Sequence, residues 1–155
     1  MSRAFVKEPD GYEPEELPDL PVSEERNLVT AGGLKSIQDN VSRYRQQLSE
    51  AQAKDDKAEI ARSKRDLTYW AARAGTAELI QLPSDVTEMS FGLLVTLEYE
   101  DGKTKKFRIV GQDEADPSKG LISYVSPLAR NLIGRKVRDM IEAGQHEVEI
   151  TKIEF

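Results

Sequence analysis

Residues 107–134, FRIVGQDEADPSKGLISYVSPLARNLIG, decide the fold of this 155-residue chain. The aromatic and β-branched residues at 107–110 predict a strand, and a loop rich in Asp and Glu follows at 113–120. Residues 122–125 predict a second strand. Ser126 and Pro127 then predict the start of a short helix, because serine is a favoured N-cap and proline suits the first helical position. This order of strand, acidic loop, strand and capped helix indicates an α+β domain.

The run RIVG-x-DEAD-x-x-x-x-LIS-x-x-SPLAR in this stretch resembles the C-terminal domain of the bacterial GreA/GreB transcript cleavage factors. With MSFG at 89–92, the resemblance extends over residues 90–155. It implies an FKBP-like sheet that binds RNA polymerase at the rim of its secondary channel. The polar and proline residues of the loop and the helix start are the candidate polymerase contacts, with ordinary loop and capping roles as the alternative: Asp113, Glu114, Asp116, Pro117, Ser126 and Pro127.

The composition of the chain argues against several classes of protein. The net charge of −6 argues against a protein that coats nucleic acid by itself, because phosphate binding needs concentrated Lys and Arg. With no cysteine, disulfides and thiolate metal sites are excluded. No apolar run reaches the length of a membrane span, and the first residues lack the hydrophobic region of a secretory signal. We therefore expect a soluble cytoplasmic protein that does not act at a membrane. We also expect a monomer.

Three segments are expected along the chain. Residues 1–29 form an acidic, proline-rich arm that we expect to be extended and largely mobile. Residues 30–81 form an antiparallel helical hairpin, because two apolar seams with 3-4-3-4-3 spacing are separated by a short polar turn. The first seam runs from Leu34 to Ala51 and the second from Ile60 to Ala77. Thr30 is the expected N-cap of the first helix.

Residues 82–155 form the second folded part. Alternating apolar residues at 93–99 and the Asp101-Gly102 turn predict a β-hairpin that continues to residue 110. Two further strands are expected at 137–141 and 146–153, on either side of a glycine turn. We therefore predict a mostly antiparallel sheet with one helix across it.

The polar turn of the hairpin carries the candidate catalytic residues, Asp55, Asp56 and Glu59. Asp56 and Glu59 are three residues apart at a helix start, so their carboxylates share one face. Such a pair can help to hold a divalent metal, but Mg²⁺ needs more ligands than two side chains supply. Asp-x-x-Glu is also a capping box, and this purely structural role remains open.

The family resemblance gives the turn a function. In Gre factors the hairpin enters the polymerase secondary channel, and its tip helps to bind a metal and a water that cut the extruded 3′ end of backtracked RNA. Asp56 corresponds to the metal-contacting aspartate and Glu59 to the residue that orients the water. The Mg²⁺ would be shared with the polymerase, so the protein would be an accessory factor and not an enzyme. Behind the tip, Arg62, Lys64 and Arg65 are candidate contacts to nascent RNA, or simply a solvated charged face.

The resemblance thus implies a transcription elongation factor that stimulates RNA cleavage by bacterial RNA polymerase. Its helical arms are shorter than is usual in the family. An alternative is therefore a non-catalytic channel regulator, similar to Rnk or to the Gre-like inhibitors, in which the hairpin occludes the channel. A peptidyl-prolyl isomerase is a third possibility from the fold alone, but the sequence has no evident aromatic-lined pocket.

Overall fold

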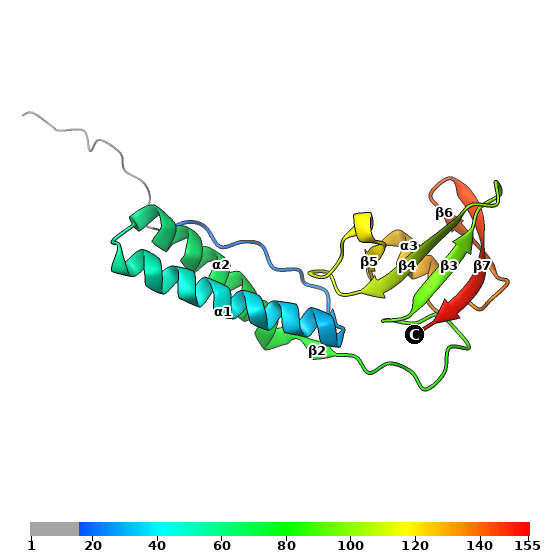
Figure 1. Cartoon of the computed structure of the whole chain (residues 1–155), viewed down its shortest axis with the longest axis horizontal. Coiled ribbons are helices and arrows are strands. Elements are labelled where there is room, and N and C mark those ends of the chain that lie inside the picture. Colours follow the sequence, from blue (N-terminus) through cyan, green and yellow to red (C-terminus); the bar gives the residue numbers. More distant parts are fainter. Residues whose placement is uncertain (1–15) are drawn as a thin grey trace, which may run out of the picture.

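The computed structural model describes residues 16–155, and the expectation for the first fifteen residues of the arm lies outside this range. The chain forms a helical hairpin that projects from a curved sheet domain (Figure 1). This arrangement confirms the α+β prediction. The elements are β1 (Leu28–Val29), α1 (Ala31–Ala53), α2 (Lys57–Thr76), β2 (Glu78–Leu79), β3 (Leu94–Glu98), β4 (Thr104–Val110), η1 (Pro117–Lys119), β5 (Leu121–Ser123), α3 (Pro127–Leu132), β6 (Met140–Ala143) and β7 (His146–Glu154).

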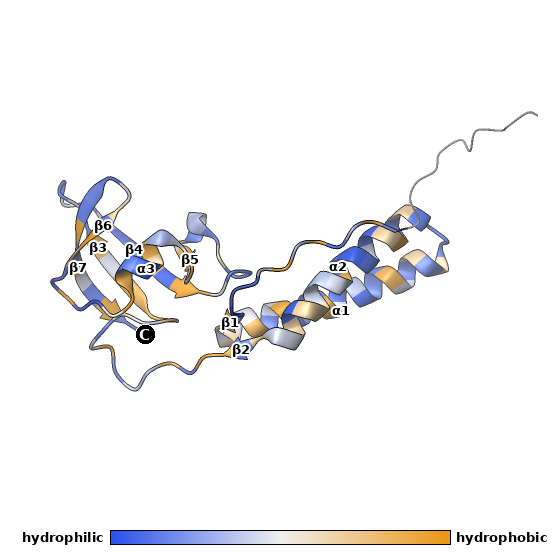
Figure 2. Ribbon diagram, turned by 180° about the vertical axis from the view of Figure 1, so that it is seen from behind, coloured by the Kyte–Doolittle hydropathy of each residue, from blue (hydrophilic) through white to orange (hydrophobic). Residues whose placement is uncertain are grey.

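The helical hairpin is explained by the residues that cap its helices and by the apolar seams that pack between them. Thr30 is the N-cap of α1, as expected, and its Oγ1 accepts a hydrogen bond from the backbone N–H of Gly33 at 3.0 Å. Seam residues such as Ile37, Val41 and Ser63 are buried between the helices, while hydrophobic and hydrophilic positions alternate along both (Figure 2). With 23 and 20 residues, the helices are about 35 and 30 Å long.

The base of the hairpin contains a pairing that the sequence did not predict. β1 and β2 lie parallel, with Leu28 opposite Glu78 and Val29 opposite Leu79. Strands of two residues are too short to show a periodic pattern, so their pairing depends on the tertiary fold. The pair joins the two ends of the hairpin where the chain enters and leaves it.

The sheet domain has five strands in the order β5-β4-β3-β7-β6. Neighbouring strands are antiparallel except β4 and β5, which are parallel. The loop at 111–120 carries the chain back to the other end of the sheet, so that β5 runs in the same direction as β4. α3 lies across the sheet, and its Ala129 and Leu132 are fully buried in the core with strand residues such as Val95 and Ile150. The predicted order of strands and helix is confirmed, with boundaries shifted by up to three residues.

Candidate functional site at the hairpin tip and the acidic loop

The turn between α1 and α2 places three carboxylates at the far end of the rod. Asp55 has a positive φ of 50°, a left-handed conformation that Asp tolerates better than most residues. Asp56 is the N-cap of α2, and its Oδ1 accepts a hydrogen bond from the Glu59 backbone N–H at 3.2 Å. Both aspartates are exposed. The capping role considered from the sequence is therefore present, and it holds the Asp56 carboxylate at the tip.

Glu59 lies within the first turn of α2 and has local partners. Its Oε2 accepts hydrogen bonds from Arg62 Nε at 3.1 Å and Nη2 at 2.8 Å. Its Oε1 lies 3.4 Å from the Ser63 hydroxyl. These contacts orient the carboxylate along the helix, while the side chain stays 37% exposed. Glu59 is thus positioned beside Asp56 but is paired with an arginine.

The donor set at the tip fits a shared metal site better than an independent one. Among residues 16–155 there is no group of three or more His, Cys, Asp or Glu that could hold a metal ion. Asp56 and Glu59 together offer two carboxylates, whereas Mg²⁺ prefers six oxygen ligands. These residues could therefore bind Mg²⁺ only with ligands from another molecule.

The three basic residues behind the tip have different surroundings. Arg62 pairs with Glu59, while Lys64 and Arg65 line a hollow beside α2 that Arg62 does not line. At 100° per residue, Arg62 and Lys64 point in nearly opposite directions around the helix, whereas Arg62 and Arg65 are three residues apart and lie side by side. Arg65 Nε also contacts Asp66 Oδ1 at 3.2 Å, and Lys64 is exposed. The structure thus places Arg62 and Lys64 on opposite sides of α2, with Arg65 between them and Lys64 and Arg65 both beside the hollow.

The acidic loop contacts the hairpin base through its first carboxylate, Asp113. Asp113 Oδ2 accepts a hydrogen bond from Arg73 Nε at 2.5 Å, and its Oδ1 accepts one from the Tyr69 hydroxyl. Arg73 is only 2% exposed, and its Nη2 also donates to Asn27 Oδ1 at 2.8 Å. Burial raises the pKa of Tyr69 to about 12, and the hydrogen bond to Asp113 adds to this shift.

The next carboxylate, Glu114, contacts the start of α1. Its Oε2 accepts a hydrogen bond from Thr30 Oγ1 at 2.6 Å. Asp113 and Glu114, which the sequence suggested as polymerase contacts, therefore have partners on the hairpin. Arg73 was not singled out from the sequence, so this contact between the loop and the hairpin base was missed. A charged residue beside the seam, far from the polar turn, was the available signal.

The remaining candidates of the sheet domain occupy turn and cap positions. Asp116 caps η1, where its Oδ1 accepts from the Ser118 hydroxyl at 2.5 Å, and this hydrogen bond lowers the pKa of Asp116. Ser126 caps α3 through a 3.3 Å hydrogen bond from the Ala129 backbone N–H. Pro117 and Pro127 follow these caps and are exposed. These four residues are positioned by local hydrogen bonds and remain at the surface.

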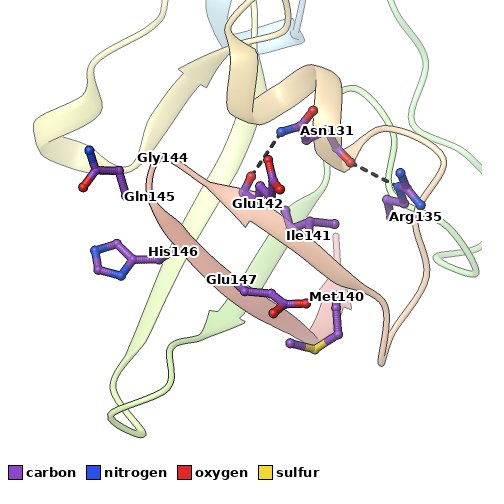
Figure 3. A pocket seen from close by; sticks show the side chains of 9 residues that line it. All are labelled: Asn131, Arg135, Met140, Ile141, Glu142, Gly144, Gln145, His146 and Glu147. Atoms are coloured by element: carbon purple, nitrogen blue, oxygen red, sulfur yellow. Dashed lines mark hydrogen bonds between the residues drawn. The ribbon is translucent and has the colours of Figure 1, made fainter.

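A separate hollow of about 640 Å³ lies between α3 and the β6–β7 hairpin (Figure 3). Its lining includes Asn131 and Arg135, the half-exposed side chain of Met140 on β6, and His146 on β7. The Asn131 side-chain amide donates to the Glu142 carbonyl at 3.1 Å, so the helix end is tied to the edge strand. No Phe, Tyr or Trp lines this hollow, which argues against an isomerase groove there.

Comparison with known proteins places the chain in a family. The family described as "Transcription elongation factor, GreA/GreB, C-term" matches residues 84–155. The GreA of Bartonella tribocorum is 33% identical over 158 residues, which span 84% of this chain and 99% of that protein. The chain belongs to the GreA/GreB family of transcription elongation factors. Because the alignment reaches almost the whole relative, family membership includes the hairpin as well as the sheet domain.

Two other relatives of this GreA/GreB family protein are also transcription elongation factors, and they align over fewer residues. The GreA of Sphingopyxis alaskensis is 43% identical over 107 residues, or 66% of either chain. The GreB of Haemophilus ducreyi is 31% identical over 135 residues, covering 75% of this chain and 83% of the relative. The solved GreA/GreB factor from Nitrosomonas europaea covers 85% of this chain with 15% identity and a TM-score of 0.41.

Proposed function

We propose that this protein binds bacterial RNA polymerase at the secondary channel and stimulates cleavage of the 3′ end of RNA in backtracked complexes. Family membership and the projecting hairpin support this proposal. The single observation that carries it is the position of Asp56 and Glu59, which lie together at the far end of the rod. A carboxylate pair at such an end can reach into a site that the rest of the protein cannot enter.

The tip residues would have separate roles. Asp56 would contribute a carboxylate to a Mg²⁺ whose other ligands come from the polymerase, and that ion would supply a polarised water for phosphodiester hydrolysis. Glu59 would orient the water by accepting a hydrogen bond from it. For this role Glu59 must release Arg62 and bind the water instead. The side chains of Glu59 and Arg62 are 37% and 52% exposed, so solvent weakens their ion pair. Asp55 would hold the turn in its left-handed conformation beside them.

The sheet domain would hold the polymerase at the channel rim. Pro117 and Pro127 are exposed and lie beside two capped turns, so they offer a rigid surface to a partner. Asp116 and Ser126 complete this surface. Asp113 and Glu114 would act by fixing the direction of the hairpin relative to the bound domain, because their carboxylates contact α2 and Thr30.

The proposal includes a contact to nascent RNA. Lys64 and Arg65 lie on one stripe of α2, about two turns from the tip residue Asp56. At this position they could bind phosphates of an extruded 3′ segment. Arg62, paired with Glu59, would contact RNA only after that pair opens. The protein would act with the polymerase in the cytoplasm, as a monomer. Among residues 16–155, no helix combines the length and apolar character needed to cross the bilayer.

A cleavage assay on stalled, backtracked elongation complexes tests the tip. With Mg²⁺, the wild-type protein should shorten the 3′ end of the RNA, and Asp56→Asn and Glu59→Gln should each lower the rate by about 10²-fold or more. Glu50→Gln is the matched control, because it removes an exposed carboxylate of α1 near the tip that is not one of the proposed catalytic residues. The Glu50 carboxylate accepts a hydrogen bond from the Gln46 side chain. Equal cleavage by all four proteins would refute the catalytic tip.

The alternative function is a channel regulator that occludes without catalysis. One observation favours it: the alignment with the Bartonella tribocorum GreA runs over 158 residues but includes only 84% of this 155-residue chain, so the aligned part of the relative is longer. A shorter rod would leave Asp56 short of the polymerase active site. The same assay distinguishes the two functions, because an occluding protein would bind the complexes and inhibit RNA synthesis without shortening the RNA.

A further inference from the structure

The described part of the N-terminal arm lies along α2. It runs beside the helix from near the hairpin tip to the hairpin base, and both ribbon views agree on this path (Figures 1 and 2). Between residue 16 and β1 the arm has no helix or strand, so this part does not lie there as part of a sheet. Its position depends on side-chain contacts with the helix.

One stripe of α2 faces the arm. Four residues with helical spacing line a hollow of about 130 Å³ together with three residues of the arm: Ala61, Lys64, Arg65 and Thr68 from α2, and Glu16, Leu17 and Asp19 from the arm. Ala61 is 4% exposed at the bottom of this stripe. Leu17 is half-buried, whereas Glu16 and Asp19 are exposed on either side of it. The arm thus combines one apolar contact with two carboxylates, opposite a lysine and an arginine.

The downstream end of the arm is firmly attached to both domains. Arg26 Nε donates to Glu78 Oε2 at 3.0 Å, and the Arg26 carbonyl accepts a hydrogen bond from the Tyr124 hydroxyl. Asn27 is buried and donates to the Arg73 carbonyl at 2.8 Å. Asp19 lies seven residues and Glu16 ten residues before the attached Arg26, so this short tether gives both carboxylates a high effective concentration at the stripe.

We infer that the acidic arm is an intramolecular occupant of the Lys64–Arg65 stripe and competes there with RNA phosphates. The stripe presents the exposed Lys64, and Arg65 in contact with Asp66, above a small apolar floor. The arm supplies carboxylates that can occupy the positions of phosphates. This inference rests on the RNA contact included in the proposed function. Its consequence is that the free protein has a low affinity for RNA, and that RNA binding at the stripe displaces the arm.

A binding titration without polymerase tests the competition. A short fluorescent single-stranded RNA is titrated at low salt with the full-length wild type and with Glu16→Gln/Asp19→Asn, and the anisotropy gives each Kd. We expect the double variant to bind about five- to tenfold more tightly, because an occupant held at high effective concentration has been weakened. Glu24→Gln/Glu25→Gln is the matched control, since it makes the same change in net charge elsewhere on the arm.

A second pair of variants shows where the RNA binds. The gain in affinity should disappear when Glu16→Gln/Asp19→Asn is combined with Lys64→Gln/Arg65→Gln. An equal gain in the Glu24→Gln/Glu25→Gln control, or a gain that persists without Lys64 and Arg65, would show a general charge effect and overturn the inference. Equal Kd values for wild type and Glu16→Gln/Asp19→Asn would overturn it as well.

Displacement of the arm has its own readout. Because the chain contains no cysteine, Pro18→Cys places a single spin label next to the hollow. The label should broaden the amide signals of residues 64–68, and saturating RNA should restore them. Broadening that RNA leaves unchanged would overturn the competition. None of these measurements involves Asp56, Glu59 or polymerase, so failure here and failure of the cleavage assay are independent results.

Discussion

At the scale of single residues, the joint between the two domains depends on one buried guanidinium. Arg73 comes from the hairpin, Asp113 from the sheet domain and Asn27 from the end of the arm, and all three meet in one hydrogen-bond network. The Asp113 side chain is 10% exposed and that of Arg73 2%, so water screens this ion pair poorly. Removal of either partner leaves the other charge buried.

The first prediction concerns this ion pair. Arg73→Ala should lower the free energy of unfolding of the hairpin by about 3–5 kcal/mol, because Asp113 would remain buried without its partner. Urea unfolding followed by the fluorescence of Trp70, the only tryptophan, measures the effect. Arg45→Ala, on the solvent face of α1, is the control and should change stability by less than about 0.5 kcal/mol. Equal midpoints for the two variants would contradict the structural role.

The second prediction concerns pH. Since burial and Asp113 raise the pKa of Tyr69 to about 12, the folded state favours the neutral phenol more than the unfolded chain does. This contribution to stability is complete below the ordinary pKa, about 10, and is lost as the pH rises to about 12. The difference in urea midpoint between wild type and Tyr69→Phe should therefore shrink across this interval. A difference that is constant from pH 8 to 12 would argue against the hydrogen bond.

At the scale of elements, the hairpin tip combines a cap with a candidate catalytic group in one side chain. Asp56 stabilises α2 through its contact with the Glu59 backbone N–H, and its carboxylate is also the proposed metal contact. The two roles have different chemical requirements. Capping needs only a small oxygen acceptor, whereas metal binding needs negative charge.

The third prediction separates these roles. Asp56→Ser should keep the stability of α2 within a few tenths of a kcal/mol, because serine caps as well as aspartate, whereas Asp56→Ala should lose about 1 kcal/mol. Both variants should lose RNA cleavage if the carboxylate contributes to catalysis. Thermal unfolding and the cleavage assay measure the two effects. Full cleavage by Asp56→Ser would show that the residue is only a cap.

At the scale of the whole molecule, the direction of the hairpin is set where the backbones of the two domains approach closely. A Cβ added at Gly111, just before the acidic loop, would lie 2.3 Å from the carbonyl oxygen of Leu28 at the hairpin base. Glycine is therefore required at this contact. Together with the Thr30–Glu114 hydrogen bond, it places the rod in one orientation relative to the sheet domain.

The fourth prediction tests this approach. Gly111→Ala should separate the hairpin base from the sheet domain, because the methyl group meets backbone atoms that cannot move independently. Small-angle scattering should show a broader distribution of shapes, and protease should cut the linker at 80–88 faster. Gly75→Ala is the control, since its Cβ would meet nothing within 4 Å and alanine should stabilise α2 by about 0.5–1 kcal/mol. An unchanged scattering profile for Gly111→Ala would contradict the rigid joint.

Local patterns in the sequence were sufficient for the helices, for the main strands of the sheet and for the cap at the tip. The seam spacing predicted two helices, and Asp56, Ser126 and the Asp101-Gly102 turn marked element boundaries because caps and turns depend on residues only two or three apart. The purely local capping roles of Asp56, Asp116 and Ser126 were also accessible from the sequence. What these residues have in common is that their partners are near neighbours in the chain.

Only the tertiary structure decided the partners of Asp113 and Glu114, the burial of Arg73 and the course of the arm along α2. The Arg73–Asp113 and Thr30–Glu114 contacts join residues 40 and 84 positions apart, and no periodic pattern specifies such pairs. An acidic loop has the same local appearance whether it contacts a polymerase or the other domain of its own chain. The sequence by itself determined the helices, their caps and the tight turns, because their hydrogen bonds are local. The pairing of β1 with β2 and the partners of the charged side chains are fixed only when distant parts of the chain pack.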